Sequence, residues 1–465
     1  MWSRRDQLQS HRFLIRRIVG AMLTGEPDIA TRPLRRIGIA TFAGVMVGAV
    51  LIAGAAVWGL LRPGNQTTWQ TADDIIVEEG TGTRYIYRDD RLWPVLNYAS
   101  ARLLLGKPDA QVRDVSAKSL EGTPRATTVG IPGAPDALPA PDRLTATPWN
   151  VCTGTTTDTP QRPYVAVLPG TTLNGQTLGN DSLLVQPPND QVYLLTNSHR
   201  FAIRNPDETL AALGWLSAPV HTVGPAFLST VPAGPDLEPP PISSGGSAGP
   251  ALGAQTQTQI GEIFEIGDSS NYAVLLSDGL AAIPRTAAAI MLSGRSATKI
   301  LAADFADAPL HNGAVVPDGY PNNPQPPGTV ELANGAILCT RYDVDATGTH
   351  STEIVTLMQP PAGLAAAPAS PKGGSALPQA DRVIVNGGTG ALIRAVPAPG
   401  VTTGTIYLIT DQGIRYPIAS TVELEALGYG TVSPVPIPTD LLDVLFIGPA
   451  LSAEAATHPL NPAGK

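Results

Sequence analysis

The residues from Ile37 to Leu61 form a long apolar run that no charged side chain interrupts. A helix needs about 20 apolar residues to cross the hydrocarbon core of a bilayer, where backbone polar groups must be satisfied within the segment itself. This run is long enough to cross with room to tilt. We therefore predict one membrane span over 37–61.

The charges on either side of the run predict its orientation. Residues 1–36 carry eight arginines against three acidic residues, whereas the flank beyond Arg62 turns acidic from Asp73 onward. Because basic flanks stay in the cytoplasm, we expect a cytoplasmic N-terminus, one crossing of a membrane and a remainder outside it. The alternatives fit less well, since a cleaved signal peptide has an apolar region of about 7–15 residues and a buried core helix shows one polar face.

Composition limits what the external part can be. The chain has 47 glycines and 46 prolines among 465 residues, which indicates many turns and short elements with Pro-rich connections. The net charge of −9 comes from the external part, because the N-terminal segment is basic. Nucleic acid is therefore not an expected partner.

A strand, turn, strand and helix pattern occurs four times in the external part. Each copy opens with a tyrosine and closes its helix with a leucine at the same spacing, and glycine follows closely. The tyrosine and leucine pairs are Tyr85 and Leu105, Tyr193 and Leu213, Tyr272 and Leu292, and Tyr407 and Leu427. Further strands are expected before the hairpins, at 74–78, 183–185, 263–266 and 391–396. We predict four repeat modules, the alternative being chance recurrence in an α+β chain.

Two cysteines, Cys152 and Cys339, lie in the part expected to face an oxidising compartment. A disulfide between them is the first interpretation, two separate buried thiols are the alternative, and zinc would lack neighbouring ligands. The residues around both cysteines resemble short strands, including a hairpin over 336–344 and 352–358. We predict a central β-rich domain built from two segments and closed by this bridge.

The predicted fold class is a single-pass membrane protein with an α+β periplasmic part, in which four small hairpin-plus-helix repeat modules surround a central β-rich domain. The predicted boundaries are 1–36 for a cytoplasmic basic amphipathic segment, 37–61 for the transmembrane helix, 62–142, 181–235, 259–315 and 381–452 for modules 1 to 4, 143–180 and 316–359 for the central domain, 236–258 and 360–380 for Pro/Gly linkers, and 453–465 for a disordered tail.

Each candidate catalytic or metal motif lacks its context. Gly245–Gly249 matches a nucleophile elbow, yet it lies in a Pro/Gly stretch instead of between a strand and a helix. Asp343–Gly348 opens like a calcium loop, but Ile354 stands where the bidentate Glu belongs. The six histidines show no ligand spacing, and Pro108 stands where a phosphate loop needs a hydroxyl. We expect no catalytic, cofactor-binding or metal site.

The cytoplasmic segment resembles a known family. Gln9, His11, Arg12, Phe13 and Leu14, together with the stretch 32–36 before the span, are similar to the EccB subunit of the type VII (ESX) secretion systems of mycobacteria and related actinobacteria. The resemblance extends over the whole chain, through the single crossing, the four modules and the placement of the two cysteines.

This resemblance implies a structural core component of the inner-membrane secretion complex, whose periplasmic modules mediate assembly. The implied partners are other membrane subunits, an FtsK/SpoIIIE-type motor ATPase and further copies of the same chain. Family members are sometimes labelled ATPases, so nucleotide hydrolysis is one alternative function. Peptidoglycan binding is another, because repeated small modules on a membrane anchor suit a cell-wall ligand.

Residue types in the N-terminal part fit membrane attachment. An Arg-rich helix with an apolar face is expected to lie along the lipid of the inner leaflet or against a partner helix, with apolar residues Leu8, Leu14, Ile15, Ile18 and Met22. Small residues in the span, Gly44 and Gly48 among them, allow another helix to approach closely.

Overall fold

The structure is a computed structural model that describes residues 3–25, 33–61, 67–70, 73–156, 159–188, 190–253, 255–267, 269–328, 336–344, 350–361, 363–364, 377–398 and 400–460. The chain divides into two compact units. The first comprises 1–72, 78–81 and 114–123, and the second comprises the remaining residues.

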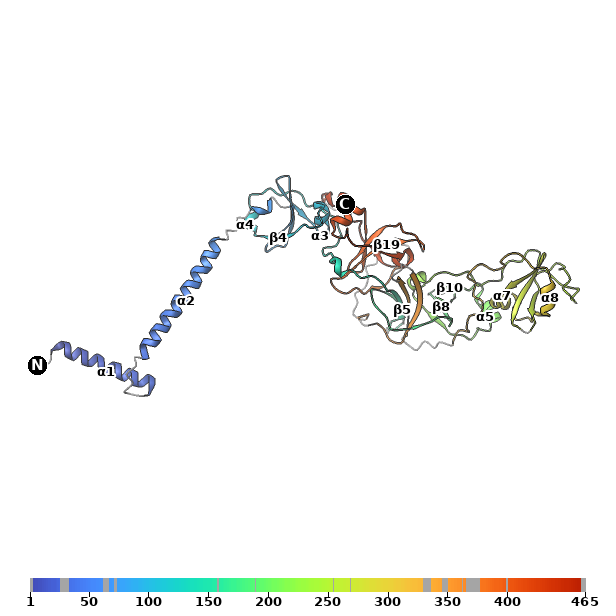
Figure 1. The fold of residues 1–465 in the computed structure, drawn as a ribbon, viewed down its shortest axis with the longest axis horizontal. Helices are drawn as coiled ribbons and strands as arrows, with labels where there is room; N and C mark the ends of the chain where they lie inside the picture. Colours follow the sequence, from blue (N-terminus) through green and yellow to red (C-terminus); the bar gives the residue numbers. More distant parts are fainter. Residues whose placement is uncertain are drawn as a thin grey trace. The chain divides into compact units, whose positions relative to one another are not determined.

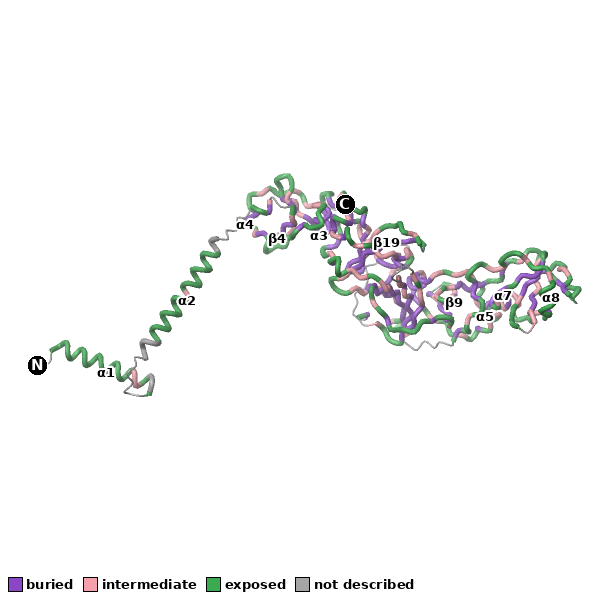
Figure 2. Tube along the Cα trace, in the orientation of Figure 1, coloured by how far each residue is buried: buried purple, intermediate pink, exposed green. Residues whose placement is uncertain are grey.

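Two long helices dominate the first unit (Figure 1). Helix α1 spans Arg4–Thr24 and begins at Ser3, whose backbone N–H donates to Asp6 Oδ2 over 3.2 Å. It ends at Gly25, which takes the left-handed conformation that stops helices. Helix α2 spans Pro33–Leu61, and short helices η1 (Thr68–Gln70) and α4 (Ala117–Leu120) complete the helices of this unit. Figure 2 shows that the described parts of α1 and α2 are almost wholly exposed.

Four mixed sheets share one strand order. Sheet 1 has the order β3-β2-β1-β4, sheet 2 β10-β9-β8-β11, sheet 3 β14-β13-β12-β15 and sheet 4 β22-β19-β20-β21-β23. In sheets 2, 3 and 4 the strand that follows the main helix pairs parallel to the first strand. Each sheet is thus a three-stranded antiparallel meander to which a helix returns one more strand, and in sheet 4 a fifth strand, β23, pairs parallel to β21.

The elements of sheets 1 and 2 follow the predicted order. Sheet 1 comprises β1 (Ile75–Glu78), β2 (Arg84–Arg88), β3 (Arg91–Val95), α3 (Tyr98–Leu105) and β4 (Val112–Val115). Sheet 2 comprises β8 (Leu183–Gln186), β9 (Tyr193–Thr196), β10 (His199–Ala202), α5 (Pro206–Leu213), β11 (Val220–Thr222) and then α6 (Pro225–Thr230).

Sheets 3 and 4 repeat this order. Sheet 3 comprises β12 (Ile263–Ile266), β13 (Asn271–Leu276), β14 (Gly279–Ile283), α7 (Arg285–Leu292), β15 (Thr298–Ile300) and then α8 (Ala302–Asp307). Sheet 4 comprises β19 (Ala391–Val396), β20 (Ile406–Ile409), β21 (Ile414–Ile418), α9 (Thr421–Ala426), β22 (Val435–Pro438), α10 (Thr439–Asp443) and β23 (Phe446–Ile447).

All four predicted hairpins are confirmed as antiparallel pairs. Local sequence explains their turns, because Asp89 and Asp90, and likewise Asn197 and Ser198, take the positive φ angles of a two-residue turn. Gly106 also ends α3 in the left-handed conformation. Helix α9 ends at Ala426, one residue before the predicted Leu427.

The central sheet has the strand order β18-β6-β5-β16-β17-β7. Its strands are β5 (Trp149–Thr155), β6 (Pro163–Pro169), β7 (Gln176–Thr177), β16 (Ile337–Val344), β17 (His350–Leu357) and β18 (Arg382–Val383), with η2 (Pro141–Arg143) before β5. The predicted hairpin of β16 and β17 is confirmed. Strand β18 comes from a third segment that the sequence assigned to module 4, and it joins because Asp381 and Ile384 both bond to the backbone of β6.

Three apolar clusters connect the sheets of the second unit. One cluster joins a face of the central sheet to sheets 2 and 4, through residues such as Trp149, Phe227 and Leu442. A second joins sheet 2 to sheet 3, and a third joins α3 and the segment after it to sheet 4. The order of packing is therefore sheet 1, sheet 4, central sheet, sheet 2 and sheet 3, which differs from the order along the chain.

The predicted disordered tail, 453–465, is wrong for its described part. Residues Ala453–Thr457 form helix α11, which packs on α3. The helix is capped because Ser452 Oγ accepts a hydrogen bond from Ala455 N over 3.0 Å, and Ala456 is small enough to be fully buried. Leu460 N then donates to Thr128 O. Residues 461–465 lie outside the described residues.

The predicted linker 236–258 is also ordered in its described residues. Leu237 pairs with Ile203 at the side of β10, and both Leu237 and Leu252 are buried. This occurs because each leucine has an apolar surface to cover, Leu237 in the cluster of sheet 2 and Leu252 in the cluster of sheet 3. Much of the second predicted linker, 360–380, lies outside the described residues, although Ala380 N donates to Val444 O.

Candidate functional site

Helix α2 carries the predicted membrane span. Among the described helices it alone is long and apolar enough to cross a bilayer, over Ile37–Trp58, and none of that stretch is buried in the chain. A Cβ added at Gly44 or Gly48 would meet no atom within 4 Å. Larger side chains at these two glycines would therefore disturb nothing within the chain itself.

Helix α1 carries the predicted cytoplasmic motif. Gln9, His11, Arg12, Phe13 and Leu14 all lie in its first half and are exposed. Because successive residues turn by about 100° around a helix, Phe13 points away from the apolar face that contains Leu8 and Ile15. Phe13 is 65% exposed, so α1 presents a lone aromatic ring among its polar residues.

The two cysteines lie opposite each other on neighbouring strands of the central sheet. Cys152 of β5 and Cys339 of β16 are register partners with Cα atoms 3.9 Å apart, and a disulfide joins them. Both are fully buried in the cluster that covers the second face of the sheet. The bridge closes a loop that contains all of sheets 2 and 3.

Two polar contacts fix the central sheet to its neighbours. Thr153 Oγ1 accepts a hydrogen bond from Gly224 N over 2.9 Å, at the start of α6. From the same face of the sheet, the Tyr342 hydroxyl donates to Pro436 O on β22 of sheet 4 over 3.3 Å. Burial raises the pKa of Tyr342 to about 12, so this hydroxyl keeps its proton at neutral pH.

A buried arginine joins sheet 1 to sheet 4. Arg102 of α3 is only 8% exposed, and its Nε donates to Ala426 O at the end of α9 over 3.2 Å. Its other nitrogens donate to Ala110 O and Pro108 O. A cation at a helix C-terminus is favourable, and here three carbonyl oxygens satisfy it. We call sheets 1 and 4 with α3, α9 and α11 the 1–4 pair.

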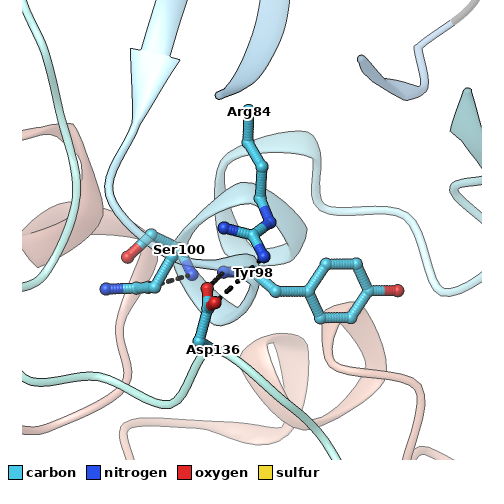
Figure 3. A network of polar contacts seen from close by, with 5 residues as sticks. Arg84, Tyr98, Ser100 and Asp136 are labelled. Carbon is cyan, nitrogen blue, oxygen red and sulfur yellow. Dashed lines mark hydrogen bonds and ion pairs between the residues drawn. The ribbon is translucent and has the colours of Figure 1, made fainter. Parts of the chain in front are cut away.

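Asp136 fixes the first turn of α3, as Figure 3 shows. Its Oδ1 accepts a hydrogen bond from Tyr98 N over 3.1 Å, and its Oδ2 forms an ion pair with Arg84 over 2.9 Å. The side chain of Asn97 accepts from Ser100 N over 3.0 Å. These contacts hold the helix that presents Arg102 to sheet 4.

Sheets 2 and 3 pack through α5 and α7, and we call this assembly the 2–3 pair. Asn322 holds the first turn of α7 as Asp136 holds that of α3, since its Oδ1 accepts from Arg285 N and its carbonyl from Thr286 N. The end of α5, the length of α7 and the segment 323–326 line a cavity of about 480 Å³, which we call the 2–3 hollow. Its lining includes Trp215, only 8% exposed, and Tyr272.

In the described residues, the nucleophile-elbow and calcium-loop motifs do not lie beside the side chains that a catalytic or metal site would need. Gly245–Gly249 forms a turn followed by a bridge between Ala248 and Gln259, with strand β12 next along the chain. Residues 345–349 of the calcium-like loop lie outside the described residues. In the described part, no group of three His, Cys, Asp or Glu side chains could hold a metal ion.

Sequence reasoning missed Arg102 and the 2–3 hollow. A signal for Arg102 was present, because it stands within the Ala- and Leu-rich stretch 99–105, where a helix face is expected to be buried. Only the contact between α3 and sheet 4 shows that one of its carbonyl partners, Ala426 O, comes from the end of α9.

Comparisons with known proteins agree along nearly the whole chain. Residues 1–460 match the family model described as "Type VII secretion system ESX-1, transport TM domain B". Among relatives, "ESX-3 secretion system ATPase EccB3" of Mycolicibacterium smegmatis is 27% identical over 479 residues, covering 96% of this chain and 89% of the relative. "ESX-5 secretion system ATPase EccB5" of Mycobacterium tuberculosis is 29% identical, covering 97% and 92%.

Chains of two solved ESX complexes are similar to this chain in fold. A chain of an intact ESX-5 inner membrane complex has a TM-score of 0.67 and 26% identity, and the likeness covers 100% of this chain and 97% of that one. A chain of an EccB3 dimer from the ESX-3 core complex has a TM-score of 0.66 and 25% identity, covering 83% of this chain and 100% of that one.

Proposed function

The chain belongs to the EccB family of type VII secretion, and we propose from this that it is a structural core component of an ESX inner-membrane secretion complex. One observation carries the proposal. The likeness to a chain of the intact ESX-5 inner membrane complex covers 100% of this chain, so the long helices and the sheets both have counterparts there.

The proposal includes an architecture and an orientation. Helix α2 crosses the inner membrane, α1 lies in the cytoplasm, and the five sheets lie in the periplasm. The excess of arginine before the span supports this direction. Sheets 1 to 4 are four copies of one repeat, supported by their common strand order and by the constant spacing from tyrosine to leucine.

The proposed partners contact different parts of the chain. The periplasmic sheets contact further copies of this chain, in keeping with the EccB3 dimer among the similar structures. The apolar face of α1 rests on inner-leaflet lipid. Its exposed Phe13 and neighbouring arginines contact other membrane subunits, among them the FtsK/SpoIIIE-type motor ATPase.

The proposed role is structural and not catalytic, although relatives carry the word ATPase in their names. The sequence offers Gly106-Lys107 followed by Pro108, which lacks the hydroxyl that a phosphate loop supplies to magnesium. Nucleotide hydrolysis that survives purification of the chain, and that one point substitution abolishes, would contradict this assignment.

The test is the size and composition of what co-purifies with the tagged full chain from membranes. We expect a large complex that contains other membrane subunits, and a monomer would contradict the proposal. Leucine at Gly44 and Gly48 is expected to shrink the complex, because small residues let helices pack closely in a bilayer. The matched control is leucine at Ala49 and Ala53, which have the same spacing on the opposite side of α2.

A further inference from the structure

The two helix pairs place different side chains at corresponding positions. The number of residues from the leading tyrosine to the leucine that ends the helix pattern is the same in all four copies, so residues of different copies can be matched by counting from the tyrosine. The matched residues are Arg102 and Ala289 on α3 and α7, Ala426 and Ala212 at the ends of α9 and α5, and Tyr429 and Trp215 just beyond them. Ala212, Trp215 and Ala289 all line the 2–3 hollow.

The hollow therefore stands where the 1–4 pair is filled. In that pair the guanidinium of Arg102 reaches Ala426 O, and the Tyr429 hydroxyl donates to Pro139 O over 2.7 Å. In the 2–3 pair the matched residue is Ala289, whose side chain is a single methyl group and leaves the corresponding space unfilled. A cavity of about 480 Å³ results, which is within the usual size range of small-ligand sites.

The lining of the hollow is cationic and aromatic. Arg285 and Arg295 both contribute to it, and none of its side chains is acidic, in a chain whose net charge is −9. Arg295 donates to Leu292 O over 3.1 Å, and in the described residues neither guanidinium forms an ion pair with a carboxylate. The amides of Asn323 and Gln325 add donors and acceptors.

We propose that the 2–3 hollow binds a carboxylate-bearing saccharide of the cell wall. The guanidinium fork matches a carboxylate, the amides match hydroxyl and acetamido groups, and the half-buried ring of Tyr272 packs on a sugar ring above the buried Trp215. An acidic peptide would use the two arginines but leave the ring of Tyr272 without a sugar ring to pack on. This inference goes beyond the assembly role, because it gives the sheets a ligand in the compartment that they are proposed to occupy.

The test uses the full chain in detergent and a defined probe, the disaccharide of N-acetylglucosamine and N-acetylmuramic acid, with binding followed by calorimetry. We expect saturable binding that weakens about tenfold when the lactyl carboxyl is reduced to the alcohol, since a charge-assisted pair is lost. Absence of binding to the wild-type chain, or equal binding of the reduced probe, would overturn the proposal. Stronger binding of a hexaglutamate peptide would assign the hollow to an acidic peptide instead.

Two variants locate the binding site. Arg285→Gln should weaken disaccharide binding about tenfold, whereas Arg91→Gln, the same change at an exposed arginine of β3 in sheet 1, should leave it unchanged. Ala289→Arg places in the hollow the side chain that fills the 1–4 pair, and it should abolish binding. Unaltered affinity in both pocket variants would overturn the assignment. The size of the co-purified complex, measured on the same preparations, reports separately on the assembly role.

Discussion

The 1–4 pair and the 2–3 pair share a backbone plan but differ in what lies between their helices. In both, a side chain after the sheet fixes the first turn of a main helix, Asp136 in one and Asn322 in the other. The 1–4 pair is then filled by Arg102 and covered by α11, whereas the 2–3 pair keeps a cavity. One pattern of strands and helices therefore yields either a filled joint or a hollow, and the two pairs differ at the helix position held by Arg102 in one and Ala289 in the other.

The pairs also differ in how they are attached to the central sheet. The 2–3 pair lies inside the loop closed by Cys152 and Cys339, while sheets 1 and 4 lie outside it. The covalent bond thus joins the two ends of the segment that carries the 2–3 pair, whereas sheets 1 and 4 lie on segments that it does not close. The experiments below test this difference, from the largest expected effect to the smallest.

Replacing both cysteines by alanine should have the largest effect. The bridge closes a loop with a sequence separation of 187 residues, so its loss is expected to lower the free energy of unfolding by at most about 5 kcal/mol. The measurement is denaturant unfolding of the full chain in detergent, with limited proteolysis to map the first cuts. We expect those cuts within 179–336. An unchanged unfolding midpoint would show that the pairing of β5 with β16 is stable without the disulfide.

Arg102→Ala tests the filled joint of the 1–4 pair. Three carbonyl oxygens lose their donor and a buried space opens, so we expect a loss of about 3 kcal/mol in the free energy of unfolding. Arg91→Ala, at an exposed position on β3 of the same sheet, is the control and should change little. Equal stability of the two variants would contradict the view that Arg102 joins sheets 1 and 4.

Ser452→Ala tests the cover that α11 provides. The Ser452 hydroxyl caps this helix by accepting from Ala455 N, and loss of such a cap costs about 1 kcal/mol. Hydrogen exchange should then increase over 453–460 and along α3, while α7 in the 2–3 pair keeps its protection. Faster exchange throughout the chain would show that the helix is not a local cover.

Asp278→Asn is expected to have the smallest effect, which depends on pH. Asp278 accepts a hydrogen bond from His311, and this bond lowers the pKa of the carboxyl in the folded chain. The folded-state pKa lies below the unfolded one, so the stabilisation is present above about pH 4 and is lost as pH falls further. The melting temperatures of variant and wild type should therefore differ at pH 6 and converge in acid.

Asp89→Asn is the matched control for that pH series. Asp89 lies in the corresponding hairpin turn of sheet 1 and has no histidine partner among the described residues. Its melting curve should follow the wild type at every pH. A gap of equal size for both variants would assign the effect to turn chemistry instead of the histidine contact.

Local patterns predicted the elements well because their causes are local. Tyrosine-led apolar runs, two-residue turns such as Asp89-Asp90 and glycine stops such as Gly106 act within a few residues. The tail helix was missed because Ala456 becomes buried only against α3, more than 300 positions away in the chain. Strand β18 and the 2–3 hollow were missed for the same reason, since both depend on contacts between segments that the sequence does not place together.

The cross-link at the base of the 2–3 pair also determines how the chain would carry a pull. If tension acts between α2 and the C-terminus, the covalent path of the force passes from β5 through the sulfur atoms to β16. The residues between the two cysteines, whose sequence separation is 187, then bear no load along the backbone. Sheets 2 and 3 and the hollow between them therefore lie off the covalent path of the force.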